Sequence, residues 1–269
     1  MRLFVSGLRK LSRRLATYLT FGLMSGLLAL ILIAVGGTAS RGGGSAAQRA
    51  ASLTLVTFPA AYDAILAFLL GLGGLFAVIY GASIAGSEWT WGTLKNAVAR
   101  GESRARYTLV SFASIALVIA IGLLIAFAIG VIAAVVGASL AGVSTSGMSD
   151  AGTLGRLPEQ FVRGGIAIIE EGALGFAIAT VARSQLAGIG AGIALYFGEQ
   201  FATIFLPDVV KYLPFHVANA AVATNSAFES RGQQLASLDA NTAMILVGVW
   251  LVGALAVAAI VTERSEIGG

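Results

Sequence analysis

Three glutamates interrupt otherwise apolar stretches, and they are the side chains of this chain best placed to do chemistry. Glu170 and Glu171 lie in one stretch and Glu199 lies in the next. A carboxylate inside a bilayer costs about 2.5 to 3.5 kcal/mol on insertion scales, which makes such a residue a functional candidate. Glu170 and Glu199 each stand about 14 residues from the turn near residues 183–185. At ~1.5 Å per residue both would lie ~21 Å from that turn, so we expect them to share one depth.

The charged segment 87–106 supplies the second group of candidates, because it separates two long stretches without charge. Ser87 is placed to cap a short helix that begins at Glu88. On this helix Trp91, Leu94 and Val98 would share one face, and its charged residues would be available to a polar partner. The alternative is an interfacial helix whose tryptophans anchor at the lipid headgroups.

The amino-acid composition indicates that these elements belong to an integral membrane protein. The 269 residues are 57% hydrophobic and 11% charged, against roughly a quarter charged in soluble domains. The basic residues flank apolar runs instead of forming a basic surface, so we expect no nucleic-acid partner. The chain has no cysteine and one histidine. No disulfide is possible, and a metal site at His216 lacks a second ligand, so an interfacial structural histidine is the favoured interpretation.

Six apolar stretches are long enough to span a bilayer as helices. They cover residues 16–35, 61–86, 108–137, 164–182, 186–206 and 241–261. If both termini are cytoplasmic, the inner segments carry eleven Lys and Arg and the longer outer loops carry six. The positive-inside rule therefore predicts cytoplasmic termini. The predicted fold class is an all-α integral membrane protein with one domain, residues 1–269.

Two further segments are predicted to lie at the membrane surface. Residues 1–15 form an amphipathic pattern with Phe4, Leu8, Leu11 and Leu15 on one face, typical of a helix lying on an anionic leaflet. The alternative, a signal peptide, conflicts with an apolar run longer than the usual 7 to 15 residues.

The outer loop 207–240 begins with a stretch that is too apolar for a free loop and too short to span. It is predicted to be a re-entrant or interfacial helical piece, broken by prolines. Its candidate residues are Tyr212, Leu213, Pro214, Phe215 and His216. Two small-residue spacings, Gly22-x-x-x-Gly26 and Gly188-x-x-x-Gly192, fit close helix packing.

The charged segment also resembles a known family. Glu88, three residues, Gly92-Thr93-Leu94-Lys95 and then Ser103-Arg104 resemble the coupling-helix region of type-2 ABC exporter permeases. Six spans, an amphipathic N-terminus and Tyr212-Leu213-Pro214-Phe215 before the last span extend the resemblance over nearly the whole chain. The resemblance implies an inner helix that docks into a groove of a nucleotide-binding subunit. The implied coupling residues are Glu88, Trp91, Gly92, Thr93, Leu94, Lys95 and Arg104.

The resemblance also implies the composition of a complex. The chain has no Gly-x-x-x-x-Gly-Lys-Ser/Thr phosphate loop, so we expect it to be no enzyme and to bind no cofactor of its own. ATP and Mg are expected on two separate ABC ATPase subunits, beside a second permease copy or a paralogue, in a bacterial plasma membrane. The expected activity is export of amphipathic or hydrophobic compounds, with Glu170, Glu171 and Glu199 as possible path residues.

Alternatives remain open at this point. The three glutamates could instead interact with a cationic substrate or a proton, or Glu170 could pair with Arg163. The whole chain could be a non-transporting membrane anchor or scaffold that docks a cytoplasmic partner. A membrane-embedded hydrolase is disfavoured, because the chain lacks the Gly-x-Ser-x-Gly and His-Glu-x-x-His motifs.

Overall fold

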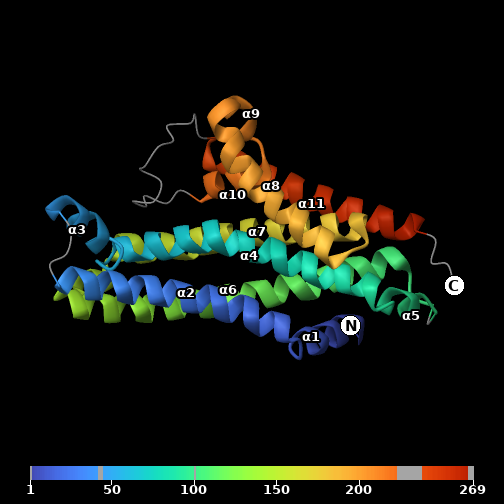
Figure 1. The fold of residues 1–269 in the computed structure, drawn as a ribbon, viewed down its shortest axis with the longest axis horizontal. Helices are drawn as coiled ribbons and strands as arrows, with labels where there is room; N and C mark the ends of the chain where they lie inside the picture. The colour runs from blue at the N-terminus through green and yellow to red at the C-terminus, as the bar shows by residue number, and fades with distance from the viewer. Residues whose placement is uncertain (1, 42–44, 100, 223–237, 266–269) are drawn as a thin grey trace.

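The computed structural model describes residues 2–41, 45–99, 101–222 and 238–265, and every regular element in these ranges is a helix (Figure 1). The helices are α1 (Arg2–Leu11), α2 (Leu15–Ser40), α3 (Ala46–Leu53), α4 (Ala60–Thr90), α5 (Thr93–Ala99), α6 (Arg104–Ala141), η1 (Ser146–Ser149), α7 (Ala151–Ala182), α8 (Gln185–Phe205), α9 (Pro207–Val210), α10 (Pro214–Ala221) and α11 (Ala240–Arg264). The predicted all-α class is confirmed for the described residues.

Five of the described helices, α2, α4, α6, α7 and α11, are long and apolar enough to cross a membrane. Together they make the chain a multi-pass helical membrane protein. The helix α8 has 21 residues but includes Gln185, Glu199 and Gln200, and it is not among the five. The sixth span therefore stays a prediction. At 38 residues, α6 is ~57 Å long, which exceeds the ~30 Å hydrocarbon core.

The long helices form a bundle in which α4 packs along α7 and α2 packs along α6 (Figure 1). Glycines make the first of these contacts close. A Cβ at Gly81 would overlap the carbonyl of Gly172, and one at Gly175 would overlap the carbonyl of Val78. Small residues let two helix backbones approach in this way when lipid offers no hydrophobic driving force between helices.

One of the two predicted small-residue spacings is used for packing. Gly188 faces Ala179 and Gly192 faces Val78, whereas Gly22 and Gly26 have nothing within 4 Å of a built Cβ. Gly22 and Gly26 therefore pack against no described helix of this chain, and close packing at this spacing stays a prediction.

The N-terminal amphipathic helix ends earlier than predicted. Helix α1 stops at Leu11, and Leu15 already begins α2 with its side chain exposed. The helix packs on α6, where Gly7 meets Ser114 and Leu11 is buried. Its apolar face is therefore covered at least partly by the protein itself.

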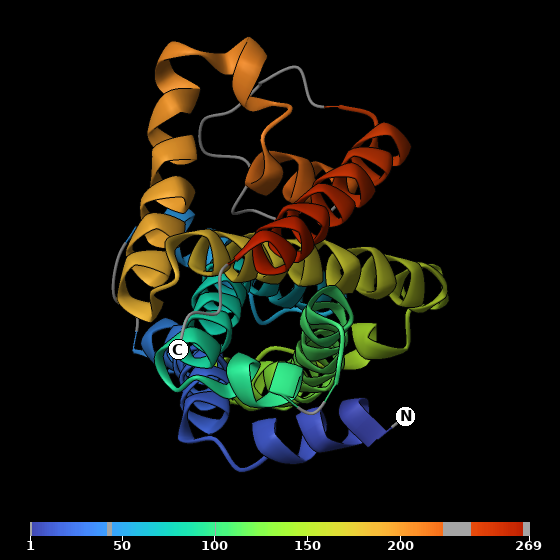
Figure 2. The ribbon, with the colours of Figure 1, turned by 90° about the vertical axis from the view of Figure 1, so that its right-hand side faces the viewer.

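The segment after α8 leaves the axis of the bundle. Helices α9 and α10 lie to one side, near the middle of the long axis (Figure 1), and α10 lies between α8 and α11 when the bundle is viewed from its end (Figure 2). Pro207 and Pro214 each occupy the first helical turn, where the missing N–H costs nothing. Residues 223–237 of the predicted re-entrant loop lie outside the described part.

Candidate functional site

Glu88 is the centre of a buried polar junction at the end of the bundle that carries α5. Its Oε1 accepts from the ammonium of Lys10 on α1. Its Oε2 accepts from the hydroxyl of Thr93 on α5, and from the hydroxyl of Tyr107 on α6 at 2.7 Å. Glu88 itself lies on α4 and is only 6% exposed. One carboxylate thus joins four helices, and we call Lys10, Glu88, Thr93 and Tyr107, together with Arg14, the α5 junction.

Arg14 is the second cation of the α5 junction. Its guanidinium donates to the hydroxyl of Ser87 at 2.6 Å, lies 3.9 Å from Glu88 Oε1, and stacks over Trp91 at 4.8 Å from the ring centroid. A carboxylate held by two cations and two hydroxyls has its lone pairs satisfied, as a buried charge requires. The structure therefore corrects the prediction that Glu88 is available to a partner.

The helix predicted from Glu88 onward is also corrected. Helix α4 continues without a break to Thr90, so Ser87 caps nothing and its hydroxyl bonds back to the carbonyl of Ile84. The separate helix α5 starts only at Thr93, after Gly92 with φ of 63°. A positive φ suits glycine, because it has no Cβ to clash. The tendency of Ser87 to cap a new helix is weaker than the stabilisation gained when α4 continues and packs against its neighbours.

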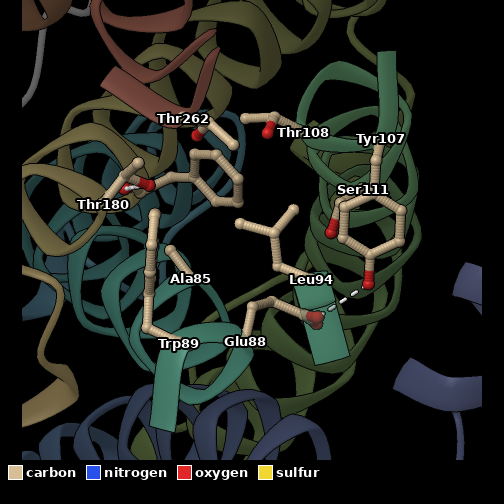
Figure 3. Close-up of a pocket in the computed structure, with 10 residues that line it drawn as sticks. Ala85, Glu88, Trp89, Leu94, Tyr107, Thr108, Ser111, Thr180 and Thr262 are labelled. Atoms are coloured by element: carbon tan, nitrogen blue, oxygen red, sulfur yellow. Dashed lines mark hydrogen bonds between the residues drawn. The ribbon is translucent and has the colours of Figure 1, made fainter. Parts of the chain in front are cut away.

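Leu94 anchors α5 to the spans instead of facing outward. The side chain is 5% exposed and points into a cavity of about 20 Å³ (Figure 3). The cavity is lined by residues of α4, α5, α6, α7 and α11: Ala85, Glu88, Trp89, Leu94, Tyr107, Thr108, Ser111, Phe176, Thr180 and Thr262. The prediction that Trp91 and Leu94 share one docking face is wrong, since Trp91 is 63% exposed and precedes α5.

The described residues of α5 and of the turn before it differ in exposure. Trp91, Asn96 and Ala99 are exposed, while Gly92 and Thr93 are half-buried. The side chain of Lys95 lies outside the described part of the structure. Arg104 does not reach α5, because its guanidinium donates to the carbonyl of Ser265 at 2.6 Å and so ties α6 to the end of α11.

The three candidate glutamates lie on two helices that pack together, Glu170 and Glu171 on α7 and Glu199 on α8. Glu170, Glu171 and Glu199 are 0%, 1% and 2% exposed, and Glu199 lies near enough to act electrostatically on both residues of α7. We call these three residues the acidic cluster. Both oxygens of Glu170, Oε2 of Glu171 and Oε1 of Glu199 have no hydrogen-bond partner within the described part of the chain. The alternative pairing with Arg163 is not formed, because that guanidinium bonds to Glu159 on α7 and to Asn241 at the start of α11.

Glu199 is linked to the candidate residues of the outer segment. Its Oε2 accepts from the backbone N–H groups of Phe215 and His216, at 3.1 and 3.3 Å, and lies 3.3 Å from Nδ1 of His216. Leu213, the residue before α10, offers no side-chain cap. The carboxylate of α8 therefore caps α10, where free N–H groups and the helix dipole favour a negative charge.

The remaining residues of the outer segment hold it in place. Phe215 is fully buried and packs edge-on against Tyr196 at 5.0 Å, and Pro214 is buried. The carbonyl of Tyr212 accepts from the indole N–H of Trp250 on α11 at 3.0 Å. His216 Nε2 lies 3.2 Å from the hydroxyl of Thr203. The structural interpretation of His216 thus agrees with its contacts.

Several residues of these sites could not be found from the sequence. Lys10 and Arg14 precede Glu88 by more than seventy residues, and no spacing rule connects them. Gly74 on α4 provides the space for Glu171, since a Cβ there would overlap the carboxyl group. Tyr107 stands at the start of a run without charge, and this position in the sequence does not reveal its hydrogen bond to Glu88.

Fold and sites together define a multi-pass helical membrane protein with a polar junction at one end and buried carboxyl groups within the bundle. A family model described as a protein of unknown function, DUF2705, matches residues 49–267. The chain belongs to the DUF2705 family. A comparison with curated proteins finds no match.

Proposed function

We propose that the chain is the transmembrane permease subunit of an ABC transporter that exports amphipathic or hydrophobic compounds, driven by a separate ATPase. The observation that carries the proposal is the construction of α5. It is a seven-residue helix between the ends of two long helices, anchored inward by Leu94 and Thr93 and open outward at Trp91 and Asn96. This arrangement suits a helix that receives force from a partner, and the resemblance to type-2 exporter permeases supports the same role.

The contacts of α5 define how a displacement would spread. Leu94 lines a cavity together with residues of α4, α6, α7 and α11, and Glu88 connects the start of α5 to α1 and α6. Because packed interiors are stiff, a movement of α5 would shift several spans together. Gly92 and Gly101, with φ of 63° and 85°, border the helix, and such residues tolerate the backbone changes that a moving segment needs.

The proposal includes a topology and a set of partners. It takes α8 as the sixth span, α9 and α10 as a re-entrant outer segment, and both termini as cytoplasmic in a bacterial plasma membrane. Two ATPase subunits with ATP and Mg, and a second permease copy or paralogue, complete the complex. The partner surface on this chain is Trp91 with the exposed residues of α5, whereas Glu88 and Leu94 position that surface from inside.

Affinity purification in mild detergent from the native membrane tests the proposal. The wild type is expected to retain a stoichiometric ATPase. The double variant Trp91→Ala, Asn96→Arg changes exposed side chains and should lose the ATPase while the chain remains monodisperse. Asp208→Arg is the matched control, because it inserts the same residue type at an exposed site on α9, far along the chain from α5.

Two outcomes would contradict the proposal. If the wild type retains no ATPase under conditions that preserve membrane complexes, an anchor or scaffold becomes the better interpretation. If an ATPase is retained but its activity responds to no amphipathic compound in reconstituted vesicles, docking without transport is indicated. Substrate-stimulated ATP hydrolysis in the complex would support transport.

A further inference from the structure

The acidic cluster has an unusual combination of properties that the coupling role of α5 does not use. Glu170 is fully buried with neither carboxyl oxygen hydrogen-bonded, and Glu171 on the same helix has one unpartnered oxygen. Glu199 faces them from α8, and its Oε1 is also unpartnered. Four carboxyl oxygens are thus withheld from water without a donor, a situation that is costly unless a ligand or a proton compensates it.

Among the described residues no cation pairs with Glu170 or Glu171, whereas Glu199 faces His216 at 3.3 Å. The stretches of α4, α6 and α11 that pass the cluster contain no charge in residues 64–87, 107–141 and 240–262. The charged or titratable groups on the helices packed around Glu170 and Glu171 have other partners: Arg163 with Glu159, Lys211 with Asp208, Asp63 with Arg156 and Gln160, and Tyr196 with the carbonyl of Gly71. His216 bonds to Thr203 and to Glu199, the third member of the cluster.

The geometry favours the smallest cation as the ligand. Within the described residues, no group of three or more His, Cys, Asp or Glu side chains is placed to hold a metal ion. Glu171 fills the notch left by Gly74, so that even a Cβ there would overlap its carboxyl group. A proton needs no cavity, and a neutral carboxylic acid can be buried at far lower cost than a carboxylate. We infer that Glu170 and Glu171 form a proton-binding site, with Glu199 as the neighbouring charge that reports its occupancy to α10.

The contact between Glu199 and α10 would couple proton binding at Glu170 and Glu171 to the stability of α10. With Glu170 and Glu171 neutral, the single carboxylate of Glu199 caps α10 and faces His216. Loss of the two protons would place two more negative charges beside it in a medium of low dielectric, where like charges repel strongly. Water or a cation would then enter between α7 and α8, and the cap on Phe215 and His216 would weaken. Proton release therefore loosens the outer segment.

Infrared spectroscopy of the purified full chain in lipid nanodiscs tests the binding directly. At neutral pH the wild type should show carboxylic acid C=O absorption, shifted in deuterium oxide. Glu170→Gln should remove the intensity of one acid group, and Glu170→Gln with Glu171→Gln should remove both. Glu159→Gln is the matched control, because Glu159 on the same helix is solvated and paired with Arg163. Glutamine resembles the neutral acid in shape, so the variants should fold as the wild type does.

Hydrogen exchange of the α10 amides tests the readout. In the wild type, exchange of α10 corrected for its intrinsic pH dependence should rise when the acid absorption disappears at higher pH. In the double glutamine variant it should stay at the low-pH level. Absence of the acid absorption at neutral pH, or its persistence in the double variant, would overturn the proton site. Exchange of α10 that does not follow the absorption would overturn the link to Glu199. Neither measurement involves an ATPase, so it fails or succeeds independently of the transport proposal.

Discussion

Glu88→Ala is expected to detach α1 and α5 from the bundle more than any other single change at the α5 junction. The substitution removes the common acceptor of Lys10, Thr93 and Tyr107. Two cations and two hydroxyls then lose their partner in an environment where the side chain of Glu88 was only 8% exposed. The effect should be confined to the end of the bundle that carries α5.

The magnitude follows from the burial of each partner. Removing one member of a buried ion pair costs about 3 to 5 kcal/mol. The side chain of Lys10 is 33% exposed and can regain water, and Arg14 keeps its bonds to Ser87 and its stacking on Trp91. The lower end, about 3 kcal/mol, is therefore expected. Since each 1.4 kcal/mol is a factor of ten, local opening should become roughly 100-fold more frequent.

Hydrogen exchange with mass spectrometry on the detergent-solubilised chain measures this opening in α1 and α5. Glu102→Ala is the control, because its contact with Arg106 is 4.0 Å long and partly exposed. Surface ion pairs of that kind contribute about 0.2 to 1 kcal/mol, which corresponds to at most about fivefold in exchange. If Glu88→Ala accelerates exchange in α1 and α5 no more than Glu102→Ala does, the assignment of Glu88 as the centre of the junction is refuted.

Two further perturbations test other parts of the structure. Gly36→Ala should lower the free energy of unfolding by about 1 to 3 kcal/mol through overpacking, because the added Cβ would overlap the carbonyl of Gly137. Gly37→Ala should be neutral or stabilising, because the Cβ added there would meet no atom of a neighbouring element within 4 Å. Equal melting temperatures of the two variants would contradict the close packing of α2 on α6. Hydrogen bonds from the hydroxyl and backbone N–H of Thr153 hold the pKa of Asp150 below its usual value, so this cap stabilises α7 above the unfolded-state pKa and is lost as the pH falls through the lower folded-state pKa. Exchange of the first α7 amides should accelerate over that acidic range in the wild type but not in Asp150→Asn, and the same acid response in both proteins would count against the cap.

Much of the architecture could be predicted from the sequence, because lipid leaves the backbone few choices. A long apolar run in a bilayer must form a helix to satisfy its own N–H and C=O groups. Residues 61–86, 108–137, 164–182 and 241–261 accordingly lie within the long helices α4, α6, α7 and α11. The fixed rise of a helix predicts one depth for Glu170 and Glu199, and both side chains are buried in the structure. Residues 186–205 lie in the helix α8, but its polar residues make this helix less apolar than the five candidate spans.

Only the tertiary structure decided which way the candidate side chains point. The pattern around Glu88 and Leu94 predicts an exposed docking helix, yet both side chains are buried, since their partners come from distant parts of the chain. Capping at Ser87 is locally favourable, but packing of α4 against α7 extends that helix to Thr90. The sequence by itself therefore determined the long helices and which of the helices carry the glutamates, because both depend on backbone hydrogen bonding and on the position of each residue in the chain. The orientation of each side chain depended on packing between helices, which has no local signature.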